Sequence, residues 1–372
     1  MRLNPVRTVE YGSSKDIKDV QLVLSQSSVQ SLSCSTQGLV PVVDSQNNPL
    51  QPCKSSMAER LIRKGKATPF FKKGFFAIRI NKIVDNPIVS IIAVAIDPGS
   101  KRTGITVTTD SEVILNIQCN TPNWIKKKIE VRKMYRRTRR NRNTPYRECR
   151  FNRSIGNISP STKARWQAHL RIIDILNKIL PVSNIIIEDI QAPTKKNCKK
   201  WNNNFSPLEV GKQYFENEIL SRGFEFTKYH GFETKLHRDS RGFKKTSKKL
   251  IDKWEAHCVD SHSLAEMLIT EMIPVKDMYL LNFLQFNRRE LHQGYRKGGI
   301  RRLYGSTRSE GLNRGTLIKH SKYGLTQIGG SSQRGISLHS IDNGERLCQN
   351  AKIEDCRVLT NQSWRTAFCC NL

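Results

Sequence analysis

Four side chains in three separate segments have the types and positions that metal-assisted hydrolysis needs. Asp97 ends one apolar run, and Glu188 ends another. His257 and Asp260 are three residues apart, so on a helix they would share a face. Carboxylates at two strand ends and on one helix can converge on a pair of Mg²⁺ ions, which hold the attacking and leaving oxygens of a phosphodiester. A histidine beside them can position or activate the attacking water, because its pKa lies near neutrality.

Each of these residues also has a simpler interpretation. Asp97 is followed by Pro98 and Gly99 and could begin a turn. Glu188 could be a solvent-facing strand end, although an acid after three isoleucines loses hydration unless it meets a cation or a partner. A lone helical histidine such as His257 is more often packed or solvated than catalytic. The three segments together favour a metal site more than any one of them does.

Alternation and runs of apolar residues predict the elements that would position these groups. The run before Asp97 is rich in β-branched residues, as a buried strand is, and the turn PGSKR joins it to TGITVTT in a hairpin. Apolar residues at helical spacing, among them Trp166, Leu170 and Ile173, predict an amphipathic helix. The remaining predicted elements are a buried strand over residues 185–187, a helix over 209–222 and a helix that starts close to Trp254.

Smaller modules are predicted on either side of this core. Between Val40 and Lys82, VPVVDSQNNPLQPC indicates a strand and a turn, AERLIRKGKA a short basic helix, and FFAIRI another strand. Beyond Pro274 the chain is rich in Gly and Arg, and RGISLHS and DCRVLT are strand candidates in a β-rich module. Residues 1–37 are rich in Ser, Gln and Val, and we interpret them as a flexible leader without an assigned function.

The charge of the chain indicates a polyanionic partner. The sequence holds 63 Lys and Arg against 32 Asp and Glu, a net charge of +31, which is far more than solubility requires. The segment KKKIEVRKMYRRTRRNR would form a helix that is cationic nearly all round, so it cannot be a core element and suits phosphate backbones. A solvated charged face and a localisation signal are the alternatives. The expected nucleic-acid contacts here are Arg132, Lys133, Arg136, Arg137, Arg139, Arg140 and Arg142.

Other classes of protein are disfavoured. No apolar run reaches the length that spans a bilayer, and the N-terminus lacks the continuous apolar segment of a secretory signal. The ten cysteines contain no C-x-x-C pair, so we expect reduced thiols and neither a zinc ribbon nor a disulfide scaffold. We therefore expect a cytoplasmic, nucleoid-associated protein without membrane contact, and an organelle stays open as an alternative.

The order D-P-G-S-x-x-T-G, I-I-I-E and H-x-x-D resembles the three-part signature of RuvC-type nuclease domains, as in Cas9 and in the transposon-encoded IscB and IsrB proteins. This resemblance implies an α/β fold whose RNase H-like (RuvC) core contains a mixed sheet. It implies that Asp97, Glu188 and Asp260 bind two Mg²⁺ ions, with Mn²⁺ as a substitute. His257 would be the histidine of the third motif.

The resemblance extends beyond the three motifs. The string RRTRR, residues 136–140, is similar to the R-R-x-R-R motif of a domain family that contains IscB-like proteins, in which the arginine-rich segment is a bridge helix that holds the guide RNA. The tetrapeptide PLQP, residues 49–52, resembles the P-L-M-P sequence of their N-terminal module, with Gln in place of Met. The C-terminal part resembles the domain that reads a short DNA motif beside the target. Its expected contacts, or else ordinary surface arginines, are Arg288, Arg289, Arg301 and Arg302.

IscB and Cas9 carry an HNH nuclease domain between the second and third RuvC motifs, whereas here only 68 residues separate Glu188 from His257. His230 and His237 are the only histidines in that interval, and no H-N-H pattern surrounds them. The chain in this respect resembles IsrB, the relative without HNH. The resemblance implies an RNA-guided nickase with one cleavage centre, which acts as a monomeric ribonucleoprotein with an omega-RNA-like guide and double-stranded target DNA.

The expected domains follow from these motifs. They are a leader (1–37), the N-terminal module (38–88), RuvC part I (89–125), the arginine-rich bridge helix (126–153), RuvC parts II and III without an HNH insertion (154–273) and the C-terminal module that reads the target-adjacent motif (274–372). Two other functions stay open: a structure-specific RuvC-like nuclease without a guide, and a nucleic-acid-binding remnant that no longer cuts.

Overall fold

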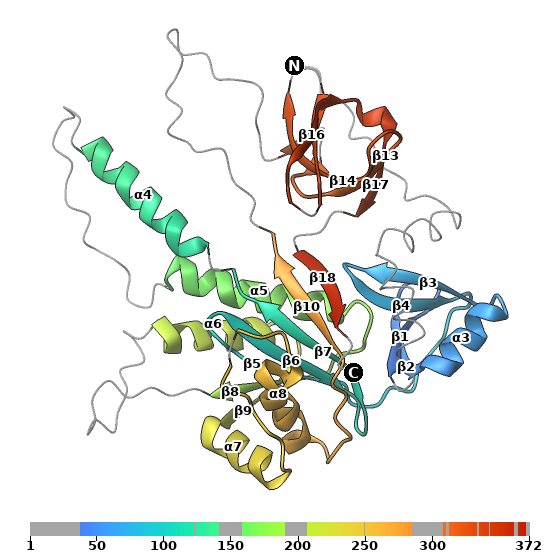
Figure 1. The fold of residues 1–372 in the computed structure, drawn as a ribbon. Helices are drawn as coiled ribbons and strands as arrows, with labels where there is room; N and C mark the ends of the chain where they lie inside the picture. Colours follow the sequence, from blue (N-terminus) through green and yellow to red (C-terminus); the bar gives the residue numbers. More distant parts are fainter. Residues whose placement is uncertain are drawn as a thin grey trace.

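The fold is built around a seven-stranded mixed sheet with helices on both faces (Figure 1). The computed structural model describes residues 38–122, 124–140, 158–189, 207–248, 250–284, 308–309, 312–332, 335–341, 343–360 and 364–369. The expected leader, residues 1–37, lies outside this part of the chain. The α/β class and the mixed sheet expected from the sequence are confirmed.

The strand order of the central sheet is β18-β10-β7-β6-β5-β8-β9. Strands β5, β6 and β7 form an antiparallel meander, and β8 and β9 run parallel to β5 on its other side. Strand β10 is parallel to β7, and β18 is antiparallel to β10. The bounds are β5 Ala93–Asp97, β6 Arg102–Thr108, β7 Val113–Asn120, β8 Asn184–Asp189, β9 Glu225–His230, β10 Met278–Phe283 and β18 Trp364–Cys369.

Alternate residues of the buried strands pack against two different layers of helices, one on each face of the sheet. Along β5, Val94 and Ile96 belong to the large core that also contains Trp166 of α5 (Pro160–Leu176) and Phe215 of α6 (Pro207–Leu220). Ala93 and Ala95 pack instead with Leu264 and Ala265 of α8 (Trp254–Leu268), and α7 (Gly231–Ser240) packs against α8. The small alanines on one face leave room for α8 to lie close to the sheet.

Gly104 in β6 allows the closest approach of α8. A Cβ at this position would lie 1.8 Å from the carbonyl oxygen of His257, so only glycine fits. Beside this contact, the Ser261 hydroxyl of α8 lies 2.8 Å from the Thr106 hydroxyl of β6, which donates to Asn116 Oδ1 of β7 at 2.9 Å. These contacts fix the position of α8 along the meander.

The N-terminal module is a four-stranded sheet, order β2-β1-β4-β3, covered by helix α3. Its elements are β1 Leu39–Val43, β2 Pro49–Lys54, α3 Ser55–Arg63, β3 Ala67–Lys72 and β4 Phe75–Ile80. The sequence predicted β1, α3 and β4. It missed β3 and it assigned PLQPC to a turn, although these residues form the strand β2 that pairs with β1.

The C-terminal part contains a separate antiparallel sheet of five strands, order β16-β15-β14-β13-β17 (Figure 1). It comprises β13 Leu317–His320, β14 Gly324–Ser332, β15 Gly335–His339, β16 Arg346–Ala351 and β17 Cys356–Thr360, with a short 3-10 helix η1 (Ile353–Asp355) and the strand pair β11 (Arg308–Ser309) and β12 (Leu312–Asn313). The strands predicted from RGISLHS and DCRVLT are confirmed as β15 and β17. Strands β10 and β18, however, lie beyond residue 274 and pair within the central sheet, so this sheet crosses the expected module boundary.

Helix α4 (Ile125–Arg140) follows β7 and extends away from the sheet (Figure 1). The helix predicted over the arginine-rich segment is therefore present up to Arg140, and residues 141–157 lie outside the described part. No helix within the described ranges is long and apolar enough to cross a membrane. The cysteines that the structure describes are free thiols.

Candidate active site: an acid cluster where β5 and β8 end

Strand pairing places two of the expected acids side by side. Strands β5 and β8 are parallel, with Ile96 opposite Ile187, so the next residues, Asp97 and Glu188, are also neighbours. The continuous apolar run of each strand stops there, and both acidic residues are half-buried. Their side chains lie close enough for the two charges to interact.

Helix α8 supplies the third acid. Because α8 rests on Gly104, the residue paired with Asp97 across the β5–β6 hairpin, Asp260 faces the same strand end. Asp260 is 4% exposed and lies close enough to Asp97 for their charges to repel. The structure thus brings together three residues that are far apart in sequence: Asp97, Glu188 and Asp260.

The surroundings of Asp97 disfavour the charged form of its side chain. Loss of hydration raises its pKa well above the ordinary value, and the neighbouring carboxylates of Glu188 and Asp260 raise it further. Lys245 opposes this shift. A carboxylate is kept in such surroundings at a cost in stability, and a cation bound between the acids would remove that cost.

Asp260 is held by two basic side chains. The Arg238 guanidinium of α7 donates to its Oδ1 at 2.8 Å, and the Lys245 ammonium donates to its Oδ2. Neither Arg238 nor Lys245 was expected from the sequence. Both lie in the string TKLHRDSRGFKK, which has no catalytic pattern of its own, and only the packing of α7 on α8 gives them their role.

Two further features border the cluster. His257 lies one turn before Asp260 on α8, is buried, and contacts β6 through its backbone carbonyl at Gly104. Gly231, the first residue of α7, lies against Glu188, because a Cβ there would be 2.8 Å from Glu188 Oε1. The start of α7 therefore limits the space on the Glu188 side.

The donor set fits a hard divalent cation. Asp97 interacts electrostatically with both Glu188 and Asp260, and carboxylate oxygens are the protein ligands that Mg²⁺ takes. Within the described ranges no three Asp, Glu, His or Cys side chains are already spaced as a complete ligand set. Both oxygens of Asp260 instead have cationic partners, so metal binding requires a side chain to move.

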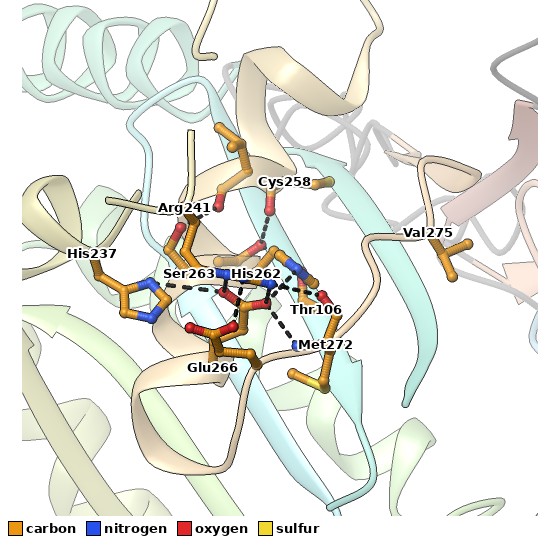
Figure 2. A network of polar contacts seen from close by, with 12 residues as sticks. Thr106, His237, Arg241, Cys258, His262, Ser263, Glu266, Met272 and Val275 are labelled. Carbon is orange, nitrogen blue, oxygen red and sulfur yellow. Dashed lines mark hydrogen bonds and ion pairs between the residues drawn. The ribbon is translucent and has the colours of Figure 1, made fainter. Parts of the chain in front are cut away.

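A second charged network lies further along α8 (Figure 2). Its centre is Glu266, whose side chain is fully buried. Arg241 approaches both Glu266 oxygens at 3.3 Å, the Met272 N–H donates to Oε1 at 2.9 Å, and His262 Nε2 lies 3.3 Å from Oε1. His237 of α7 is 3.8 Å from Oε2. This network ties α7 to α8.

The expected nucleic-acid contacts are only partly within the described chain. On α4, Arg132, Lys133, Arg136 and Arg137 are exposed. The helix ends with Arg139 and Arg140, and the structure does not describe the side chains of these two residues. The other expected contacts also fall outside it: Arg142, Arg288, Arg289, Arg301 and Arg302.

Comparison with known proteins adds a family match over the first part of the chain. Residues 40–202 match the family model described as RRXRR protein. The match spans the N-terminal module, the meander, α4 and β8, and therefore includes Asp97 and Glu188 but not Asp260. No curated protein matches the chain.

Solved structures of RuvC and of a mitochondrial Holliday junction resolvase match the chain at low similarity. RuvC of Thermus thermophilus in complex with a Holliday junction substrate is 12% identical over 47% of this chain and 90% of its own, with a TM-score of 0.28. The yeast mitochondrial Holliday junction resolvase Ydc2 is 14% identical over 49% of this chain and 79% of its own, with a TM-score of 0.25. The candidate site therefore rests on the strand register and on the contacts of α8.

Proposed function

We propose that this protein is a metal-dependent endonuclease of RuvC type, which is guided by RNA and nicks one strand of its target DNA. The observation that carries the proposal is the meeting of Asp97, Glu188 and Asp260 where β5, β8 and α8 converge. The match of residues 40–202 to the RRXRR family and the net charge of +31 support a nucleic-acid substrate.

The roles of the residues follow from their chemistry. Asp97, Glu188 and Asp260 would hold two Mg²⁺ ions through their carboxylate oxygens. When bound, the ions stabilise the charge that develops on the attacking and leaving oxygens of the phosphodiester. His257 would accept the proton of the attacking water at an imidazole nitrogen. Arg238 would keep Asp260 oriented through its contact with Oδ1.

RNA guidance is supported by α4. Its exposed basic residues, Arg132, Lys133, Arg136 and Arg137, lie on a helix that projects from the sheet, and such a helix suits two phosphate backbones at once (Figure 1). In this proposal α4 is the bridge helix, base pairing with the guide supplies sequence specificity, and the C-terminal five-stranded sheet belongs to the module that reads the adjacent motif. The single RuvC-type site would cut the displaced strand.

The test uses the full chain purified with its co-expressed RNA. We expect the complex to convert a supercoiled plasmid with a matched target to the nicked circle in Mg²⁺, and Asp97→Asn and Glu188→Gln to abolish nicking. Asp110→Asn is the matched control, because Asp110 is an exposed acid in the loop between β6 and β7. Nicking at the wild-type rate by Asp97→Asn would refute the active site.

The nucleic acid that copurifies separates the remaining functions. A single discrete RNA, with nicking that depends on the match between RNA and plasmid, supports the guided nickase. Cleavage of branched DNA without RNA would instead support a structure-specific nuclease, the activity that the solved Holliday junction resolvases suggest. Tight RNA binding without cleavage of any matched target would support a silent remnant.

A further inference from the structure

Lys245 is a basic side chain that interacts with all three acids. It lies in the connection between α7 and α8, where residues 241–253 form no helix or strand in the described part. Its ammonium donates to Asp260 Oδ2, and it also interacts electrostatically with Asp97 and Glu188. A divalent cation that joined these carboxylates would lie in the same place.

Arg238, the other partner of Asp260, is placed differently. It extends from helix α7, its side chain is only 14% exposed, and it also contacts Asp239 at 3.2 Å. It bonds to Oδ1 of Asp260, whereas Lys245 bonds to Oδ2. Arg238 is therefore suited to a fixed support of Asp260, whereas Lys245 is suited to an exchangeable one.

The stem of Lys245 and its surroundings permit that exchange. Its side chain is 36% exposed, and a lysine carries its charge on a flexible four-carbon chain. The ammonium can turn toward solvent without unfolding either helix, because no helix or strand contains it. A metal ion and the ammonium repel each other, so the two cations would compete for the Asp260 carboxylate.

We propose that Lys245 is the resident cation of the acid cluster: it bridges the carboxylates in the metal-free protein, leaves when metal binds, and so sets the metal affinity of the site. This inference rests on the proposed function. In the metal-free state, Lys245 keeps three like charges together at the end of β5. In the metal-bound state, its release gives the ions access to Asp260. Lys245 is thus a positioning residue, which acts through the carboxylates.

Metal binding by the full chain, measured with Mn²⁺ by calorimetry and by electron paramagnetic resonance, tests the inference without any cleavage assay. Lys245→Met removes the charge and keeps a similar length. We expect it to bind Mn²⁺ about tenfold more tightly, because a unit charge a few ångströms from the ion is removed. We also expect a lower thermal midpoint in EDTA and a larger rise on adding Mn²⁺ than the wild type has.

Two controls isolate the contact. Lys244→Met removes the same charge from the exposed neighbouring residue and should leave Mn²⁺ affinity unchanged. Lys245→Arg keeps the charge and should restore the wild-type affinity. A purely structural role would lower the thermal midpoint of Lys245→Met equally with and without Mn²⁺.

The outcomes separate this inference from the proposed function. If Lys245→Met binds Mn²⁺ as the wild type does, or more weakly, Lys245 is not the competing cation and the nuclease proposal is untouched. If the wild type binds no Mn²⁺, or binds it equally well with Asp97→Asn, both proposals are wrong. Tighter binding by Lys244→Met as well would assign the effect to overall charge and overturn the inference.

Discussion

Helix α8 carries two buried carboxylates less than two turns apart, and they have opposite surroundings. Asp260 faces two other acids and is held by Arg238 and Lys245, one of them on an exposed connection. Among the described residues, the groups that contact the Glu266 carboxylate are donors, and they include Arg241, His262 and the Met272 N–H (Figure 2).

The pKa of Glu266 and the pKa of Asp97, which lies beside Asp260, are shifted in opposite directions. Burial alone would raise the pKa of Glu266, but contacts with His262, the Met272 N–H and Arg241 outweigh it and lower the pKa to about 2. At Asp97, burial and the neighbouring acids act in the same direction and raise the pKa. A buried carboxylate with only favourable partners suits a structural role, whereas a cluster of like charges is a candidate ligand site. Helix α8 carries one residue of each kind.

The largest expected effect is the loss of cleavage in Asp97→Asn. We expect the nicking rate to fall at least about 10³-fold, which is about 4 kcal/mol on the activation barrier, because a metal ligand is removed. Metal-free stability should stay equal or rise, because one of three repelling charges is gone. Nicking kinetics and urea unfolding in EDTA measure the two effects. A large loss of stability in Asp97→Asn would show instead that Asp97 stabilises the fold.

Glu266→Gln should give the reverse pattern. The substitution leaves the Arg241 guanidinium without its buried counter-charge, and breaking such a pair by removing one partner costs about 3 kcal/mol. Urea unfolding at neutral pH measures this loss. The Mn²⁺ affinity of the folded fraction should match that of the wild type. A variant that is stable but binds metal poorly would place Glu266 with the acid cluster.

The pH dependence of stability sharpens the comparison. The folded pKa of Glu266 is about 2, below its ordinary 4.5, so its contribution is present above pH 4.5 and is lost as pH falls toward 2. Between about pH 4.5 and about pH 3 the wild type should lose about 2 kcal/mol more than Glu266→Gln does. Urea midpoints for both proteins at these pH values provide the measurement. Parallel curves would show that Glu266 titrates normally.

The sequence indicated the residues of one of these two clusters and not those of the other. The apolar runs that end at Asp97 and Glu188 mark strand ends, and the helical spacing of His257 and Asp260 marks a shared face, so local patterns made these residues candidates for one site. The contacts of Glu266 join α7, α8 and the segment after α8. No local pattern indicates such a contact, because it depends on how α7 docks.

The role of Arg238 and Lys245 and the pairing of β10 with β18 were also missed, because they too depend on contacts between distant segments. Arg238 and Lys245 are ordinary members of a basic chain until α7 packs on α8. Strands β10 and β18 pair with each other although 80 residues separate their facing ends, Phe283 and Trp364, so the sequence could not place β18 in the central sheet. In the sequence, Gly104 is one residue of a predicted strand. The structure shows why it is glycine, because the His257 carbonyl occupies the space of a Cβ.

The smallest expected effect belongs to Ser261, which lies between the two carboxylates on α8. Its hydroxyl contacts Thr106 at 2.8 Å, and Thr106 keeps its bond to Asn116 when the serine is removed. Ser261→Ala should therefore cost only about 1 kcal/mol in urea unfolding. Mn²⁺ affinity should not change, because Gly104 and Glu266 still fix α8 on either side. A marked loss of Mn²⁺ affinity would mean that this one hydroxyl sets the position of Asp260, and that the two halves of α8 are not independent.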